Sequence, residues 1–348
     1  MRPRVLATQV LNRTALDRQL LLSRRRLSVP DALERVGGIQ TQYAPSGYIG
    51  LWSRIEAFER DRLTRALVAG RALQGTLMRM TIHMVSATDF PLFSEGVRRS
   101  RREWWLRVSK SRHLDAYPYD EMAEILTEAL SDGPRPRSEL VEALVAAGFP
   151  KEVWEGAGLW VDMIRVPPSG TWEKRRADLY GLAPQTPTVT EQAGLGHLAT
   201  RYLRAFGPAT VADISSWSGV PQSTIAPVVD GMSLRRFRDE DEGELIDLPR
   251  LRIVDAGVPA PVRLLPHWDA LLLVHARRKA ILPEELRTEI FNSKNPFSVG
   301  TFLVDGVVAG TWRLEGNRVS SEVLTPIHKD ARRQLDDEVA ALEAFAAD

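Results

Sequence analysis

The sequence predicts a mainly helical α+β protein, built from three tandem winged-helix modules and a C-terminal small β-barrel. Two segments before residue 249 each combine a Gly-Pro turn, short helices and strand-forming residues, and the N-terminal segment has a similar order. After residue 249, short strands separated by Pro and Gly replace the helices. A chain of 348 residues is long enough for several cores. The four parts are assigned to residues 1–115, 116–187, 188–248 and 249–348.

The first winged helix is predicted from helical spacing followed by strand-like alternation. Apolar residues recur at helical intervals near residues 5–22, 30–42 and 59–69. Residues from Leu73 to Val85 then alternate in polarity, which indicates a hairpin of two strands. Helices followed by a strand pair are the order of a winged helix, in which the hairpin is the wing.

The second and third winged helices are predicted from capped helices and glycine stops. Gly-Pro dipeptides at 133–134 and 207–208 precede helices that end at Gly148 and Gly219. A proline after each stop begins the next helix, as a helix-turn-helix requires. Strand-forming stretches in the position of a wing follow at residues 169–182 and 233–248.

The C-terminal part is predicted to be a small β-barrel or curled sheet. The Asp305-Gly306 dipeptide between alternating apolar residues is a strong hairpin signal. A helix of about residues 330–346 is expected to close this part of the chain. Strands are expected at residues 263–265, 270–275, 301–303 and 307–314.

Composition and missing motifs exclude several classes of protein. The chain has no cysteine, which excludes disulfides, zinc-thiolate sites and thiol catalysis and indicates a reducing compartment. No window approaches the roughly 20 apolar residues of a membrane span, so a cytoplasmic protein is expected. Walker, His-Glu-x-x-His and Gly-x-Ser-x-Gly sequences are absent, and Gly194-Leu195-Gly196 lies in a predicted helix with no strand before it. No metal or other cofactor is expected.

A net charge of only +1 leaves nucleic-acid binding to a local patch. The clearest basic segment is residues 98–112, which on one helix face would suit a phosphate backbone. The alternative is a solvated helix with two tryptophans in the core. The bases are Arg98, Arg99, Arg101, Arg102, Arg107, Lys110 and Arg112, and the tryptophans are Trp104 and Trp105.

Two glutamines occupy an unusual position near the N-terminus. A helix that starts near Pro30 loses regularity at Gly37-Gly38 and must end before Pro45. Gln40 and Gln42 therefore lie on irregular backbone, which can present side chains into a cleft. The alternative is that both amides only satisfy exposed backbone groups.

The segment Val-Gly-Gly-Ile-Gln-Thr-Gln at residues 36–42 resembles the active-site motif of AlkZ/YcaQ-type winged-helix DNA glycosylases, in the AlkZ-like Gln-x-Gln branch. Further segments resemble the same family in the same order, and the matching set extends to residue 312. Two residues depart from the pattern: Met80 replaces a more usual Gly, and Thr41 replaces an apolar residue. The further segments are residues 79–85, 207–210, 217–219, 265–269 and 304–312.

This resemblance implies a C-shaped arrangement of the modules around double-stranded DNA, with Gln40 and Gln42 as catalytic residues that orient the attacking water. Thr81 and His83 face the same side of a predicted strand and are expected to contact DNA near the lesion. The expected reaction is monofunctional hydrolysis of the N-glycosidic bond of cationic N7- or N3-alkylpurines, which leaves an abasic site. The expected substrates include bulky natural-product adducts and interstrand crosslinks. The resemblance thus predicts a repair hydrolase that acts at the nucleoid.

Two other functions stay open at the level of sequence. Winged helices are often transcription regulators, and Ser223 and Thr224 could begin a DNA-recognition helix. No dimer-forming segment is apparent, so a monomer is expected, which disfavours operator reading. A lesion-binding protein without catalysis is the third possibility. Trp104, Trp105 and Trp268 are candidates for stacking on DNA. General repair and self-resistance to an alkylating product are not distinguished.

Overall fold

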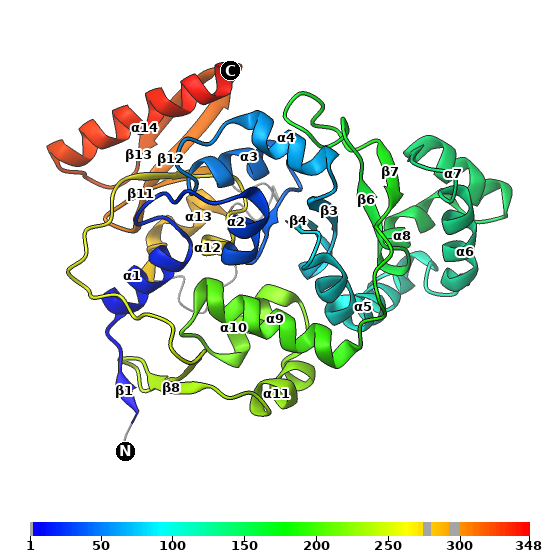
Figure 1. The fold of residues 1–348 in the computed structure, drawn as a ribbon, viewed down its shortest axis with the longest axis horizontal. Coiled ribbons are helices and arrows are strands. Elements are labelled where there is room, and N and C mark those ends of the chain that lie inside the picture. The colour runs from blue at the N-terminus through cyan, green and yellow to red at the C-terminus, as the bar shows by residue number, and fades with distance from the viewer. Residues whose placement is uncertain (1–2, 274–279, 292–298) are drawn as a thin grey trace.

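The computed structural model describes residues 3–273, 280–291 and 299–348. They form an α+β fold in which three sheets are surrounded by helices (Figure 1). The sheets are six-, four- and three-stranded within this part of the chain, and helix α9, Glu191–Phe206, lies between several of the other helices. The predicted α+β class is therefore confirmed.

The first helices confirm the predicted positions but are shorter and more numerous than expected. The helix expected at 30–42 ends at Val36, because Gly37 adopts the left-handed conformation of a helix C-terminus, with φ 78°. A further helix begins at Pro45, where proline's missing N–H costs no helical hydrogen bond. The helices are α1, Thr8–Arg18; α2, Val29–Val36; α3, Pro45–Trp52; and α4, Arg60–Val68.

The expected hairpin between Leu73 and Val85 is present, and it belongs to a larger sheet. Its two strands are antiparallel, with Gln74 opposite Met84. The first strand also pairs with a strand of the second predicted module, through Gly75 opposite Ile164. The six strands, in spatial order, are β2, Ile39–Gln40; β4, Ile82–Ser86; β3, Ala72–Thr76; β6, Met163–Arg165; β7, Leu179–Leu182; and β5, Arg135–Pro136.

The strand pair expected at 169–182 forms differently from the prediction. Only its second half is a strand, β7, and its partner β6 lies before the predicted stretch. Residues 166–178 form the long connection between them. The predicted separate wings of the first two modules are thus joined in one sheet, because β6 pairs with both β7 and β3.

Helix α9 crosses a second long helix at a pair of glycines, Gly194 and Gly96. A Cβ atom at Gly194 would lie 2.5 Å from the backbone nitrogen of Gly96, so only glycine permits this approach. Gly194 lies inside α9, as expected from the missing preceding strand. The other crossing helix is α5, Phe90–Val108, which belongs to the first predicted module. The helices of the second predicted module lie beyond α5 (Figure 1). They are α6, Tyr119–Ala129; α7, Arg137–Ala146; η3, Lys151–Val153; and α8, Trp154–Trp160.

The third helix pair has the predicted caps. Thr210 and Asp213 form a reciprocal capping box at the start of α10, Val211–Ser218, and Gly219 ends that helix with φ 76°. Helix α11, Gln222–Asp230, follows after Pro221. The hairpin expected at 233–248 is present and gains an N-terminal strand that pairs in parallel. Its strands are β1, Arg4–Val5; β8, Arg235–Arg238; and β9, Glu244–Asp247.

The C-terminal part is an antiparallel sheet with the predicted hairpin at Asp305-Gly306. The expected strand at 270–275 is wrong for residues 270–273, which form helix α12, Ala270–Leu273; His275 lies outside the described residues. Helix α14, Lys329–Ala347, confirms the C-terminal helix and lies along β12 and β13 (Figure 1). The strands are β10, Arg263–Leu265; β11, Gly300–Val304; β12, Val307–Glu315; and β13, Arg318–Val323. The remaining short helices of the described residues are η1, Met78–Met80; η2, Lys110–Arg112; η5, Glu284–Leu286; and α13, Arg287–Ile290.

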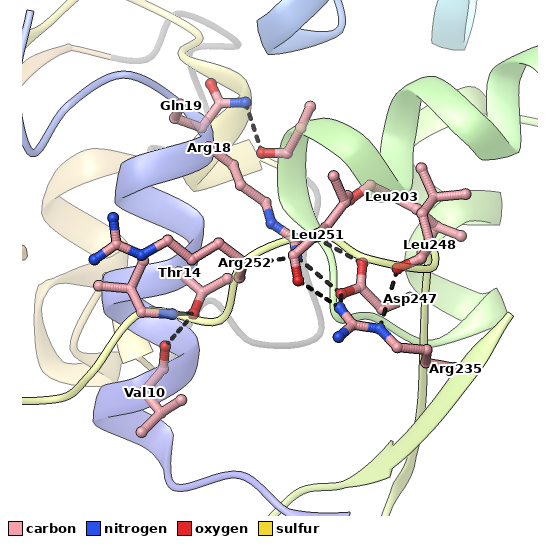
Figure 2. A network of polar contacts seen from close by, with 12 residues as sticks. Val10, Thr14, Arg18, Gln19, Leu203, Arg235, Asp247, Leu248, Leu251 and Arg252 are labelled. Atoms are coloured by element: carbon pink, nitrogen blue, oxygen red, sulfur yellow. Dashed lines mark hydrogen bonds and ion pairs between the residues drawn. The ribbon is translucent and has the colours of Figure 1, made fainter.

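A buried ionic network joins α1 to the three-stranded sheet (Figure 2). Both carboxylate oxygens of Asp247 accept hydrogen bonds from Arg18, each 2.8 Å long, and the Asp247 side chain is completely buried. Arg235 contacts the same carboxylate at 2.8 Å, and Arg18 also donates to the carbonyl of Leu203 in α9. The network therefore fixes three elements that are far apart in the sequence.

Candidate active site

The Gln-x-Gln segment is a short strand at the edge of the six-stranded sheet. Gly37 and Gly38 turn the chain out of α2, with φ of 78° and 81°, and a Cβ atom at Gly38 would lie 2.8 Å from a methyl group of Val85. Strand β2 then pairs with β4, where Gln40 lies opposite His83. The paired glycines therefore allow the motif to lie close against β4.

The two glutamines have fixed orientations but unequal exposure. Gln40 is buried, and its Oε1 accepts a hydrogen bond of 2.9 Å from Arg79. Gln42 is exposed, and its Oε1 accepts from the backbone N–H of Ile82 at 3.2 Å. Because both partners are donors only, the amide oxygens must face them. Neither NH₂ group has a hydrogen-bond partner among the described residues, so both glutamines present donors.

Arg79 and His83 lie next to Gln40: Arg79 donates to its amide oxygen, and His83 is its partner on β4. Arg79 donates to the carbonyl of Trp217 and lies 3.3 Å from Nε2 of His83. A guanidinium only donates, so Nε2 accepts, and Nδ1–H donates to the carbonyl of Thr81 at 3.1 Å. Burial, together with the charge of Arg79, lowers the pKa of His83 to about 3. Burial also lowers the pKa of Arg79 to about 10. At neutral pH the pair is therefore a neutral imidazole beside a guanidinium cation.

This lowered pKa predicts a pH-dependent contribution to stability. Between the unfolded value of about 6.5 and the folded value of about 3, the unfolded chain binds more protons at His83 than the folded one. The contribution is therefore fully present above pH 6.5 and is lost as the pH falls. The free energy of unfolding is measured in urea at pH 7 and at pH 5. Its decrease from pH 7 to pH 5 is expected to be about 2 kcal/mol larger for the wild type than for His83→Gln. Equal losses in the two proteins would contradict the buried, neutral imidazole.

The backbone beside this pair accounts for the glycine that the resembling sequences more often have where this chain has Met80. Arg79 and Met80 have φ of 50° and 60°, in the left-handed region that non-glycine residues rarely adopt. Glycine is favoured at such a position, and the resembling sequences more often have it where this chain has Met80. Met80 keeps the conformation while its side chain packs on the core of the second module.

Segments from the other parts of the chain also contact the motif. Arg165 of β6 donates to the carbonyl of Thr41 at 3.1 Å. Arg175, in the connection between β6 and β7, donates to the hydroxyl of Tyr43 at 3.0 Å. The ring of Tyr43 meets His267 edge-on, with centroids 5.5 Å apart. Together with the Trp217 carbonyl, these contacts place the motif where all four predicted parts meet.

A cavity of about 320 Å³ lies beside Gln42, between the six-stranded sheet and helix α8. Its walls are mixed, with aromatic rings, aliphatic side chains and few charges, which is typical of ligand cavities. The lining residues are Gln42, Gln74, Gly75, Thr76, Met80, Ile82, Trp154, Glu155, Gly158, Met163, Arg165 and Tyr180. Gln42 is thus the member of the motif that faces an accessible hollow.

The arginines expected to contact DNA are largely occupied within the protein. Arg98 pairs with Glu95 and Asp162, and Arg102 donates to the carbonyls of Leu159 and Trp160. Arg99 is exposed but pairs with Glu191 at 3.0 Å. Several arginines of this helix are therefore held by partners within the protein, which differs from both the phosphate-binding face and the solvated helix considered from the sequence.

Arg101 does not fit the expected DNA contact. Its side chain is 4% exposed and donates to the carbonyls of Thr76 and Ser94. A DNA phosphate has no access to such a group, so Arg101 is corrected to a residue that supports β3. Trp105 is likewise buried and donates to Tyr119, whereas Trp104 is 43% exposed.

The remaining candidates lie in two places. Thr81 is partly exposed next to His83. His83 is only 3% exposed and its two ring nitrogens face Arg79 and the carbonyl of Thr81, so its expected DNA contact is corrected to a buried position beside Gln40. Ser223 is exposed and Thr224 is partly exposed in the first turn of α11. No hydrogen bond or ion pair within the described residues joins this turn to the glutamines. The structure thus groups Gln40, Gln42, Thr81 and His83.

Three contacts of the motif were not foreseen from the sequence. Arg79 belongs to a segment that carries the family resemblance, so its residue type was a usable signal. Arg165 and Tyr43 gave no local signal, because their partners are distant in the sequence. Among the described residues, no group of three or more histidine or acidic side chains is arranged to hold a metal ion, and no helix is long and apolar enough to cross a membrane.

The family model described as DNA glycosylase AlkZ-like matches residues 33–345. No curated protein matches the sequence. Among solved structures, the Streptomyces sahachiroi DNA glycosylase AlkZ is similar, with a TM-score of 0.82 and 18% identity over 99% of this chain and 97% of that chain. At this identity the structural likeness shows a shared fold.

Proposed function

The chain belongs to the AlkZ-like DNA glycosylase family, and from this premise we propose that it hydrolyses the N-glycosidic bond of N7- or N3-alkylated purines in double-stranded DNA. The observation that carries the proposal is the pair of neutral amides at Gln40 and Gln42, whose oxygens are held by the protein and whose NH₂ groups have no partner among the described residues. Gln42 also borders the cavity of about 320 Å³. The reaction leaves an abasic site.

The amides act by orientation. Breaking an N-glycosidic bond develops positive charge on the sugar, and many enzymes place a carboxylate there. No carboxylate hydrogen-bonds either glutamine in the described part of the chain. An amide is too weak a base to take a proton, but its NH₂ group can donate to a sugar or phosphate oxygen and its carbonyl keeps a second lone pair for water. The glutamines therefore hold water and nucleotide in a reactive geometry.

This limited assistance determines the substrate class. A purine alkylated at N7 or N3 carries a positive charge, and its departure neutralises that charge. Such a leaving group needs no protonation by the enzyme, which agrees with a site whose two central side chains do not titrate. Uracil and other neutral bases lack this advantage and should be poor substrates.

Bulky adducts and interstrand crosslinks are included in the proposal. The cavity beside Gln42 is partly open to solvent, so a large substituent does not have to enter an enclosed pocket of the kind that receives a flipped base. We retain the three winged helices, residues 1–115, 116–187 and 188–248, arranged in a C shape around the duplex, and a barrel-like C-terminal part. The helix pairs α6–α7 and α10–α11 and the hairpin β8–β9 support this division. DNA contacts are proposed for Thr81, Arg98, Arg99, Arg102, Ser223 and Thr224.

The same reasoning favours a monomeric repair enzyme that acts at the nucleoid in the cytoplasm. A transcription regulator is the second candidate, because Ser223 and Thr224 are accessible at the start of α11. A lesion binder without catalysis is the third. Protection of one defined operator without release of a base would favour the regulator, and tight adduct binding without an abasic product would favour the lesion binder.

A panel of duplexes tests the proposed function. Duplexes with N7-methylguanine, N3-methyladenine, a bulky N7 adduct or uracil are incubated with excess protein, and abasic sites are detected by alkaline cleavage. The alkylpurines are expected to be released at least about 10²-fold faster than uracil, because only they leave as neutral bases. Release of uracil at a comparable rate would contradict the mechanism, and no release from any duplex would contradict the function.

A further inference from the structure

Arg79 is a guanidinium with an unusual set of partners. It donates to the Oε1 of Gln40 at 2.9 Å, lies 3.3 Å from Nε2 of His83, and donates to the carbonyl of Trp217. All three acceptors are neutral. Within the described residues no carboxylate forms an ion pair with Arg79, whereas Arg18 and Arg54 each have one. Arg101 and Arg165 also lack a carboxylate, but they donate to backbone carbonyls and a hydroxyl, while Arg79 contacts two side chains of the paired strands β2 and β4. A cation in these surroundings is therefore costly to the fold.

The backbone adds to that cost. Arg79 and Met80 are both left-handed, which costs of order 1 kcal/mol or more for each non-glycine residue. Gly219 lies directly against the turn, where an added Cβ atom would stand 3.0 Å from the backbone nitrogen of Arg79. Strained residues and charges without an opposite charge persist where they serve function. A role in stability alone does not explain this arrangement.

We propose that Arg79 is a positioning residue for Gln40, which holds the amide so that its NH₂ group faces the damaged nucleotide; this inference rests on the proposed function. Without Arg79, the amide of Gln40 is free to rotate and to present its oxygen instead. A hydrogen bond from a cation is stronger than one between neutral groups, and it polarises the amide so that its N–H bonds become better donors. The Trp217 contact fixes the guanidinium itself to the end of α10.

The test compares Arg79→Met and Arg79→Lys with a matched control. Arg236 is an exposed residue of β8 that pairs with Glu244 of β9, away from the motif. Arg236→Met should therefore behave as the wild type. Single-turnover release of N7-methylguanine and duplex affinity are measured for each protein, and thermal unfolding confirms the fold. Arg79→Met is expected to lower the rate constant by about 10²-fold, with a change of less than about tenfold in Kd. The rate constant of Arg79→Lys should lie between those of the wild type and Arg79→Met, because the ammonium group of lysine keeps one donor for Gln40.

A second readout does not depend on activity. The positive charge of Arg79 contributes to the low pKa of His83, so Arg79→Met should raise that pKa, measured by NMR titration of the imidazole. An unchanged pKa would mean that the guanidinium does not lie beside His83 and Gln40, and that result would overturn the geometry on which the inference rests. A wild-type rate constant in Arg79→Met would overturn the inference as well. So would a decrease in the rate constant that is matched by an equal loss of duplex affinity. Wild-type protein that releases no alkylpurine would overturn the proposed function and this role together.

Discussion

Replacing Gln40 and Gln42 together by alanine is expected to reduce the single-turnover rate of alkylpurine release by about 10³-fold while duplex binding persists. Both side chains end in an NH₂ group with no partner in the described protein, and both are held by donors on the opposite side of the amide. Their loss removes the groups that orient water and sugar. It does not remove the wider surface that holds the duplex, so Kd should change little.

The control for this experiment removes two glutamines elsewhere. Gln185→Ala/Gln192→Ala changes the same number of amides at exposed positions, and its rate should equal that of the wild type. The single variants separate the two roles: Gln42→Ala affects the group that borders the cavity, whereas Gln40→Ala affects the buried one. Release by the double variant at the wild-type rate would exclude the motif as the active site.

The largest expected effect on stability follows from Asp247. Its side chain is fully buried and accepts hydrogen bonds from both Arg18 and Arg235 (Figure 2). In Asp247→Ala the Arg18 side chain, which is 3% exposed, keeps its charge without an opposite charge nearby. Removing one partner of such a pair typically costs about 3–5 kcal/mol. Urea unfolding monitored by circular dichroism should show this loss.

Two further variants separate the charge from the packing. Replacing both members, as in Arg18→Met/Asp247→Leu, is expected to recover part of the loss, because no buried charge is then left unpaired. Arg26→Met is the matched control, since that arginine is 85% exposed in its pair with Glu56 and should change stability by less than about 1 kcal/mol. A loss for Asp247→Ala no larger than that of the control would contradict the energetic role of the network.

Local signals predicted much of the fold. The Thr210–Asp213 capping box, the glycine stop at Gly219 and the Asp305-Gly306 hairpin all lie where the sequence placed them, because each depends on residues that are close in the chain. The run Ala270–Leu273 was assigned to a strand and is a helix. A short apolar run has no periodicity that distinguishes the two, and here the carboxylate of Asp269 caps the first turn by accepting from Leu271.

Long-range pairing could not be predicted. The parallel pairing of β1 with β8 and the pairing of β3 with β6 join residues more than 80 positions apart, and no local pattern encodes such a register. The same limit applies to the site. Two glycines and a proline predicted irregular backbone at the glutamines, and the family resemblance implied their catalytic role. The contact of Arg79 with Gln40 requires a left-handed turn at an arginine, which the sequence does not favour.

The convergence of all four parts of the chain on one short strand has a consequence for how activity can be lost. An isolated fragment of residues 1–115 would contain both glutamines and Arg79, yet it would lack the Arg165 guanidinium, the Trp217 carbonyl and the His267 ring that surround them. Proteolytic cuts or substitutions far from the glutamines can therefore abolish turnover by loosening a single remote support. We therefore expect the site to be complete only when the chain has packed at least as far as His267.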